Sequence, residues 1–359
     1  MIRPLSVAPD AEFSKAFGLG RPRLNDPLLR VENLTACLST PAGDRPVLDD
    51  VSFDLQRGRI LCLVGESGCG KSVTARAILR LLDWPLHIAP TSRVLFDGQD
   101  LGTLPERGMR QVRGRDIAMI FQDPMSSLNP VKRVGEQVAE TLILHRRVSR
   151  REARDRTIAL FRQVGIPVPE RRVRQFPHEL SGGMQQRAMI AMALACDPKV
   201  LLADEPTTAL DATIQAQILD LLRELRETRD MAILLITHDL GVVAEIADDI
   251  AVMYAGRIVE YGPVEQVLTS PQHPYTEQLL RSVPRLLMPR DQRLAMIGGT
   301  VPSPLDRPPG CAFAPRCTYA FERCTVDPSP QLSETASHAA SCWLCHDGPR
   351  ATRGVWEAA

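Results

Sequence analysis

The chain has 359 residues, of which 44% are hydrophobic, so it can build a real core in one large domain or a few smaller ones. Its 43 basic and 43 acidic residues cancel, which argues against nucleic acid as the main partner. No run of about 18 apolar residues predicts a membrane span. The start, residues 1–4, lacks the apolar core of a signal peptide, so we expect a soluble cytoplasmic protein.

The N-terminal part of the chain predicts antiparallel strands. Residues 1–27 are rich in proline and polar residues, which predicts a poorly ordered extension. Residues 28–38 and 47–56 then alternate apolar and polar side chains, as half-buried antiparallel strands do. A further strand pair is predicted at residues 93–101, with its turn at Asp97 and Gly98.

Residues 65–72, GESGCGKS, fit the phosphate-binding pattern Gly-x-x-x-x-Gly-Lys-Ser/Thr. The apolar run 60–64 predicts the strand that enters this loop, and residues 73–79 predict the helix that leaves it. Glycines let the backbone turn with its N–H groups facing inward, and the helix N-terminus adds positive potential. We expect Lys71 to reach the β- and γ-phosphates and Ser72 to bind Mg²⁺. The predicted nucleotide-binding residues of this stretch are Gly65, Glu66, Ser67, Gly68, Cys69, Gly70, Lys71, Ser72 and Val73.

Gln122 follows a predicted buried strand at residues 117–121. In an α/β sheet the carboxyl end of a strand is where ligands bind, although a solvated strand end remains the alternative for a lone glutamine. Residues 131–196 then predict mostly helix. The arginines between positions 146 and 174 fit a solvated helical face, with docking to a partner or to anionic lipid as the alternative.

Residues 180–187, LSGGMQQR, open one of these helices. Ser181 is a good N-cap, and the neighbouring glycines Gly182 and Gly183 leave the helix N-terminus accessible to an anion. The stretch therefore predicts a second anion-binding site, with a simple capped helix as the alternative.

Two further predicted strands end in polar residues. The strand at 200–204 ends in Asp204, which can hold Mg²⁺, and Glu205 follows it as a candidate acceptor of a proton from an attacking water. Asp211 lies where the chain turns into the next helix. The strand at 232–237 is followed by His238, which can donate to a γ-phosphate or serve as a structural histidine.

In this order, the phosphate loop, Gln122, LSGGM, Asp204–Glu205, Asp211 and His238 resemble the nucleotide-binding subunit of an ATP-binding cassette (ABC) transporter. The resemblance covers roughly residues 28–265. It implies an α/β P-loop NTPase fold with a mixed sheet core, an antiparallel β subdomain and a helical subdomain inserted at about 123–196. It also implies a head-to-tail dimer, in which ATP lies between one phosphate loop and residues 181–183 of the partner.

The resemblance also assigns roles to individual residues. Glu205 is implied to be the general base, His238 to hold the γ-phosphate, and Asp211 to lie in the loop that reaches across the dimer. Gln122 is implied to touch Mg²⁺ and to couple to the membrane subunits. The expected catalytic set is Lys71, Gln122, Glu205 and His238; the expected Mg²⁺ ligands are Ser72, Gln122 and Asp204; and the nucleotide site is completed by Ser181, Gly182, Gly183 and Asp211.

This chain departs from the family pattern at two positions. Met184 replaces the usual glutamine after LSGG, which leaves the serine and glycine contacts untouched. Leu38 stands where an aromatic residue often stacks on adenine, and no aromatic residue lies between Val31 and Asp50. We therefore expect apolar packing against the base and loose base selectivity.

The tail, residues 266–359, carries a predicted helix, a proline-rich extended stretch at 301–310 and four cysteines in a C-x5-C-x6-C-x17-C pattern. Four thiolates can hold a [4Fe–4S] cluster or zinc, and unliganded thiols are the third reading. The tail is similar to the C-terminal extension of oligopeptide and dipeptide importer ATPases, which implies a [4Fe–4S] cluster. The expected ligands are Cys311, Cys317, Cys324 and Cys342, with Cys345 as a competitor.

The other cysteines predict no metal site. Cys37, Cys62 and Cys196 stand among apolar residues and are expected in the core. Cys69 is interpreted as a variable position of the loop, with a redox switch as the alternative.

Together the resemblances imply an ATPase subunit that uses ATP and Mg²⁺ to energise import of di- and oligopeptides across the bacterial cytoplasmic membrane. The implied partners are a second, different ATPase subunit, two transmembrane permease subunits and an extracytoplasmic peptide-binding protein, with no nucleic acid. The chain is then expected on the cytoplasmic side of the inner membrane. Nickel or another small solute is an alternative cargo. A soluble cassette ATPase acting on DNA or ribosomes is the alternative of another class, disfavoured by the single phosphate loop and the lack of heptads.

Overall fold

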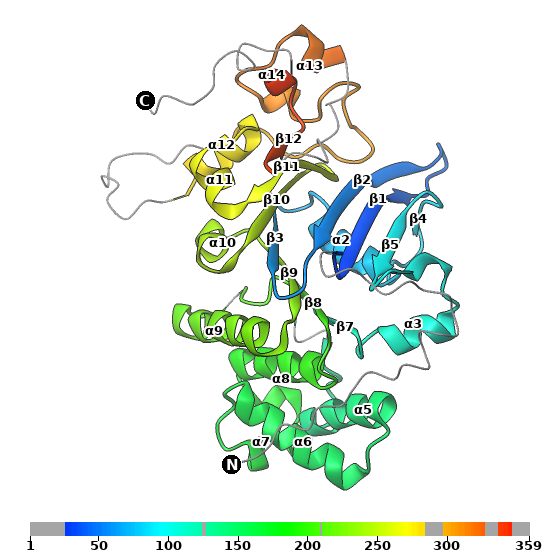
Figure 1. Cartoon of the computed structure of the whole chain (residues 1–359), viewed down its shortest axis with the longest axis vertical. Coiled ribbons are helices and arrows are strands. Elements are labelled where there is room, and N and C mark those ends of the chain that lie inside the picture. Colours follow the sequence, from blue (N-terminus) through cyan, green and yellow to red (C-terminus); the bar gives the residue numbers. More distant parts are fainter. Residues whose placement is uncertain (1–25, 124–126, 209, 284–296, 327–336, 347–359) are drawn as a thin grey trace.

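The computed structural model describes residues 26–123, 127–208, 210–283, 297–326 and 337–346. In these residues the strands form two sheets, one of five strands and one of seven. Helices cover the large sheet, a group of them forms a layer at the bottom of Figure 1, and the C-terminal elements lie at the top. The expected α/β architecture, with a mixed sheet, an antiparallel sheet and a helical part, is confirmed.

The five-stranded sheet is antiparallel throughout. Its longest pair follows the predicted alternation, since every second or third residue of the first strand, from Leu29 to Ala36, is buried. The short strand at 86–88 was not expected from the sequence. The elements are β1 (Leu29–Leu38), β2 (Arg45–Leu55), β4 (Leu86–Ile88), β5 (Arg93–Phe96) and β6 (Gln99–Asp100), followed by η1 (Leu101–Thr103) and α3 (Glu106–Val112).

The seven-stranded sheet has the order β12-β11-β10-β3-β9-β8-β7. The five strands from β10 to β7 are parallel, and β11 and β12 add antiparallel pairs at one edge. Burial on both faces explains the continuous apolar runs in the sequence. The strands are β3 (Ile60–Val64), β7 (Ile117–Ile120), β8 (Val200–Asp204), β9 (Ala232–Thr237), β10 (Asp249–Tyr254), β11 (Arg257–Pro263) and β12 (Ala339–Ala340).

The chain between β7 and β8 is mostly helical, as predicted, and forms the layer of helices at the bottom of Figure 1. It contains α5 (Val134–Arg146), α6 (Arg150–Gln163), α7 (Pro169–Arg172), η2 (Pro177–Glu179) and α8 (Gly182–Leu194). The helices associated with the sheet are α2 (Lys71–Ile78), α9 (Ala212–Arg229) and α10 (Leu240–Ile246). Among the described residues no helix is both long enough and apolar enough to span a membrane.

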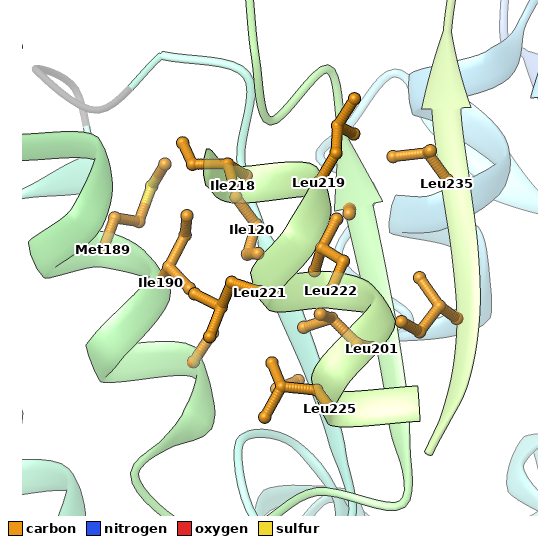
Figure 2. Close-up of a cluster of buried hydrophobic side chains, with 14 of the residues drawn as sticks. Ile120, Met189, Ile190, Leu201, Ile218, Leu219, Leu221, Leu222, Leu225 and Leu235 are labelled. Carbon is orange, nitrogen blue, oxygen red and sulfur yellow. The ribbon is translucent and has the colours of Figure 1, made fainter. Parts of the chain in front are cut away.

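Helix α9 fixes the relation between the sheet and the helical layer. Five of its residues face inward at helical spacing and none is more than 8% exposed: Ile218, Leu219, Leu221, Leu222 and Leu225. Figure 2 shows these side chains between the strands β7, β8 and β9 and helix α8, against Ile120, Leu201, Leu235, Met189 and Ile190. Helix α9 thereby packs against both the large sheet and helix α8.

The C-terminal region, described at residues 264–283, 297–326 and 337–346, folds onto the large sheet. It contains α11 (Val264–Thr269), α12 (Pro274–Arg281), η3 (Ala314–Arg316), α13 (Glu322–Val326), β12 and α14 (Trp343–His346). The proline-rich stretch 301–310 has no helix or strand, as expected, but it is docked, because Arg307 bonds to Asp49 of β2 at 2.6 Å and to the carbonyl of Ala255. Phe313, only 1% exposed, packs against Tyr254 and Tyr275. The region is therefore anchored by a strand, an ion pair and a buried ring.

Two of the three cysteines expected in the core lie there. Cys62 in β3 and Cys196 after α8 are buried, whereas Cys37 is only half-buried. The prediction for Cys37 is wrong because the side chain follows the buried Ala36 along β1 and points to the opposite, more exposed face of the sheet.

Candidate nucleotide-binding site

The loop between β3 and α2 needs its glycines. Gly65, Gly68 and Gly70 have φ angles of 154°, 80° and 114°, a region that other residues rarely adopt. A Cβ atom at Gly65 would come within 2.2 Å of the Met253 carbonyl, and one at Gly70 within 2.8 Å of Leu48. The loop is therefore closely packed against β2 and β10 at Gly65 and Gly70, whereas at Gly68 only the positive φ requires glycine.

Lys71, the first residue of α2, lies inside the curve of this loop and is 6% exposed. Its Nζ donates to the carbonyl of Gly65 at 2.7 Å and to the carbonyl of Glu66 at 2.9 Å. The ammonium group thus ties the start of the loop to the start of the helix. Positive charge is placed where the loop would surround a phosphate.

Ser72 and Asp204 come together from two neighbouring elements. The Ser72 hydroxyl donates to Oδ1 of Asp204 at 3.0 Å, and Asp204, at the carboxyl end of β8, is 1% exposed. Burial raises the pKa of this carboxyl above its ordinary value, against the lowering effect of the Ser72 hydrogen bond. A serine hydroxyl and a carboxylate are oxygen ligands of the kind that Mg²⁺ binds, so this pair fits the predicted ion.

Glu205 contacts side chains from the segments that follow three different strands. Thr208 Oγ1 donates to its Oε2 at 2.8 Å, Gln122 Nε2 donates to the same oxygen at 3.1 Å, and His238 Nδ1 lies 3.2 Å from Oε1. The strands β7, β8 and β9 are parallel, so their carboxyl ends meet at one edge and bring these residues together. Gln122 therefore contacts the predicted base in this structure, with no bond to Ser72 or Asp204 among the described residues.

The protonation state of Glu205 follows from these contacts. Burial alone would raise the pKa of Glu205, but the hydrogen bonds from Thr208 and His238 and the nearby positive charges outweigh it and hold that pKa below its ordinary value. The carboxylate is then ionised at neutral pH. An ionised carboxylate at this edge can accept a proton from a water molecule.

Ser181, Gly182 and Gly183 lie at the N-terminus of α8. Ser181 caps the helix by accepting from the Met184 N–H at 3.4 Å, and a Cβ atom at Gly182 would meet open space. Asp211 caps α9 in the same way, accepting from the Ile214 N–H at 2.9 Å. No hydrogen bond joins residues 181–183 to residues 65–72 within the described ranges, and anion binding at this helix end stays a prediction.

The matches to known proteins agree with this geometry. Residues 48–208 match the family model described as ABC transporter, and residues 259–324 match the model described as oligopeptide/dipeptide transporter, C-terminal region. The oligopeptide transport ATP-binding protein OppD of Bacillus subtilis is 49% identical over 324 residues, which cover 90% of each chain. The chain belongs to the ABC transporter ATPases. The dipeptide transport ATP-binding protein DppD of the same organism is 48% identical over 317 residues, covering 88% of this chain and 94% of DppD.

Solved ABC structures share the core of this ABC ATPase. The dimeric ATP-binding cassette MJ0796, in a post-hydrolysis state bound to ADP and Pi, superimposes with a TM-score of 0.60 at 28% identity, covering 66% of this chain and 98% of MJ0796. The cassette cbiO1 of Clostridium perfringens gives a TM-score of 0.57 at 27% identity, covering 68% of this chain and 92% of cbiO1. The predicted family, ATPase activity and fold are confirmed, whereas the roles of single residues stay predictions.

The four tail cysteines of this ABC ATPase do not form the predicted metal site. Burial raises the pKa of Cys317 to about 11, and the nearby thiols of Cys311, Cys324 and Cys342 add to the rise. No set of three or more His, Cys, Asp or Glu residues among those described is arranged to hold a metal ion. The expectation of a [4Fe–4S] cluster or zinc is therefore not supported.

Sequence reasoning missed three residues at this site. Thr208 was detectable, since its hydroxyl lies three residues after the predicted base in the turn that follows β8. Tyr275 and Arg316 both contact Glu66 of the phosphate loop, but each is more than 200 positions away along the chain, so no local pattern indicates them. Leu38, predicted to pack on adenine, is half-buried and pairs with Arg45 and Leu86, and that role stays a prediction.

Proposed function

We propose that this chain is the ATP-hydrolysing subunit of an importer for di- and oligopeptides. The observation that carries the proposal is the joint presence of the Glu205 centre and a C-terminal region of the oligopeptide/dipeptide transporter type. Relatives at 49% and 48% identity are named as oligopeptide and dipeptide transport proteins, which favours peptide over nickel or another small solute as cargo. The same names disfavour a cassette ATPase that acts on DNA or ribosomes.

In the proposed site, Lys71 binds the β- and γ-phosphates of ATP through its ammonium group. Ser72, Asp204 and Gln122 would hold Mg²⁺, which supplies charge neutralisation on the phosphate oxygens when bound. The remaining nucleotide contacts come from the loop amides at 65–73 and from residues 181–183 and 211 of a partner cassette. Gln122 would coordinate the ion through its Oε1 while its Nε2 donates to Glu205, so this side chain would link the ion to the proposed base.

The reaction in this site is a hydrolysis. A water oxygen attacks the γ-phosphorus, the bond between that phosphorus and the bridging oxygen of ADP breaks, and ADP leaves with the bond's electron pair. Glu205 takes the proton that the attacking water loses, while His238 hydrogen-bonds the γ-phosphate. Thr208 supports Glu205 by holding one of its oxygens.

We further infer a head-to-tail dimer of cassettes, because residues 181–183 are exposed or half-buried and the structure shows no hydrogen bond from them to residues 65–72 among the described residues. The second cassette is proposed to be a different ATPase subunit. ATP binding then favours the closed dimer, and closure moves two transmembrane permease subunits that receive cargo from an extracytoplasmic peptide-binding protein. In this arrangement the chain lies on the cytoplasmic side of the inner membrane. Residues 28–265 serve as the ATPase domain, with the helical subdomain inserted at about 123–196, and residues 266–359 as the extension.

An iron–sulfur cluster at the four tail cysteines is not part of this proposal, because those cysteines are not arranged as a metal-binding group. Iron and acid-labile sulfide, measured on protein purified without oxygen, decide the point. Four irons per chain would assign a cluster to these cysteines, whereas iron and sulfide at background would leave them as unliganded thiols.

Uptake by cells tests the proposed cargo. A host strain lacking this chain receives either the wild-type chain or Glu205→Gln, and the uptake of labelled dipeptides, oligopeptides and nickel is compared. We expect only the wild-type chain to restore peptide uptake, with nickel uptake the same in both strains. Restored nickel uptake without peptide uptake would reassign the cargo.

A further inference from the structure

The outer side of the phosphate loop is bound by the C-terminal region. The carboxylate of Glu66, the second residue of the loop, forms a two-pronged ion pair with Arg316, whose Nη1 and Nη2 lie 2.7 Å and 2.9 Å from the two oxygens. The Arg316 side chain is 5% exposed and that of Glu66 is 29% exposed. A bidentate pair whose arginine is buried fixes both partners better than an exposed pair does.

The backbone of Glu66 is bound as well. Its N–H donates to the hydroxyl of Tyr275 at 2.8 Å, and its carbonyl accepts from Lys71 at 2.9 Å. Tyr275 is itself completely buried, and its ring packs against Tyr254 and Phe313. Two of the three polar groups of Glu66 are therefore bonded to the C-terminal region, and the third is bonded to the lysine that is proposed to bind phosphate.

Arg316 cannot easily leave this position. Its Nε donates to the carbonyl of Gly298 at 2.7 Å, and its Nη1 also contacts the hydroxyl of Tyr254 at 3.2 Å. The guanidinium group lies over the Tyr254 ring, 5.7 Å from its centre. The arginine is thus already in place before any nucleotide arrives.

A carboxylate beside a phosphate-binding loop is unfavourable for a polyphosphate unless its charge is compensated, since like charges repel across a site of low dielectric. We infer that Arg316 is a positioning residue for nucleotide binding. It neutralises Glu66 and, with Tyr275, fixes the loop carbonyls that hold Lys71. Docking of the C-terminal region thereby sets the affinity of the phosphate loop for nucleotide. The inference rests on the nucleotide site of the proposed function and adds a residue from outside the ATPase domain.

Calorimetric titration of the full-length chain with Mg-ADP, which avoids turnover, tests this role. We expect Arg316→Gln to raise the Kd about tenfold, because it leaves the Glu66 charge unpaired beside the bound phosphates. The matched control is Arg307→Gln, which removes a second anchor of the same region but no bond to residues 65–72. We expect its Kd within about twofold of wild type.

A double variant separates charge from packing. Glu66→Gln combined with Arg316→Gln removes both charges, and we expect its Kd to return to within about threefold of wild type. An unchanged Kd in Arg316→Gln overturns the inference, and so does an equal loss in Arg307→Gln, since that result would mean general loosening of the region.

Folding and site assignment are checked separately. If Arg316→Gln shows no thermal unfolding transition, Arg316→Lys is measured in its place. This variant keeps the positive charge but loses the bidentate geometry, so its Kd should rise about threefold. An unchanged Kd in Arg316→Lys would overturn the inference. Failure of the wild-type chain to bind Mg-ADP would instead contradict the proposed nucleotide site itself.

Discussion

The side chains around Glu205 are open to solvent, whereas those behind Glu66 are buried and fixed. His238, which contacts Glu205, has a side chain that is 60% exposed, while that of Arg316, which contacts Glu66, is 5% exposed. The Glu205 contacts from Gln122 and His238 are 3.1 Å and 3.2 Å long, against 2.7 Å and 2.9 Å for the Glu66 pair. The two sides of the site therefore differ in freedom of movement. The exposed side chains around Glu205 (the catalytic edge) can rearrange around a nucleotide, whereas Glu66 and Arg316 (the back of the loop) stay in place.

Replacing the proposed base is expected to have the largest effect on the catalytic side. Glu205→Gln keeps the size and most hydrogen bonds of the side chain but cannot accept a proton, so hydrolysis should fall about 10²- to 10⁴-fold. Binding of Mg-ATP should stay within a few-fold of wild type, because the phosphate contacts of Lys71 remain. Phosphate release and nucleotide titration measure the two quantities, and undiminished turnover would place the base elsewhere.

Removing a buried ring is expected to have the largest effect on the fixed side. Phe313 is 1% exposed and packs among Tyr254 and Tyr275, so Phe313→Ala should lower the free energy of unfolding by about 3–5 kcal/mol. Leu305→Ala is the control, since Leu305 lies in the same region and is 55% exposed, and its effect should stay within about 0.5 kcal/mol. Denaturant unfolding measures both. Equal, small losses would mean that the C-terminal region is not packed as described.

A smaller effect is expected from the hydroxyl that supports the base. Thr208→Val removes the hydrogen bond to Glu205, which should lower kcat about tenfold. That bond helps to hold the pKa of Glu205 down, so its loss raises this pKa. The base is then protonated, and inactive, already at a higher pH than in the wild-type chain. The acidic limb of the pH–rate profile should therefore move to higher pH. If kcat fell tenfold but the acidic limb of the pH–rate profile did not move, Thr208 would have only a structural role.

The smallest effect is expected from the buried acid beside the base. Burial raises the pKa of Asp204, so its ionised form destabilises the folded chain at any pH above that folded-state pKa. Asp204→Asn should raise the Tm of the nucleotide-free protein by about 2 °C at neutral pH. The gain should shrink as the pH falls through the folded pKa, because wild-type Asp204 then takes up a proton. A lower Tm in the variant at neutral pH would contradict this.

The sequence predicts the site best where a functional residue also belongs to a short local pattern. The glycines of the phosphate loop, the caps at Ser181 and Asp211 and the polar residues after buried strands each leave a local pattern, and the parallel sheet then brings the strand ends together. These patterns predict the fold and the Glu205 neighbourhood.

The parts that escaped prediction depend on how distant segments dock. Arg316 meets Glu66 across 250 positions of the chain, and nothing near either residue indicates the other. The metal site at the tail cysteines was expected from the resemblance of the tail to importer ATPases and not from the cysteine spacing, and no metal-binding group is found among the described residues. Cys37 failed for a simpler reason, because an apolar neighbourhood in sequence does not tell which face of a strand a side chain occupies.

Hydrogen–deuterium exchange with and without Mg-ATP, measured on Glu205→Gln to prevent turnover, tests the division between the two sides most directly. We predict that amides at 313–317 and at Glu66 are protected in both conditions, while those at 204–208 and 238–241 gain protection when nucleotide binds. If nucleotide changed the exchange at 313–317 and Glu66 as much as at 204–208 and 238–241, the proposed difference between the two sides of this ABC ATPase site would be contradicted. No gain of protection at 204–208 and 238–241 would contradict it as well.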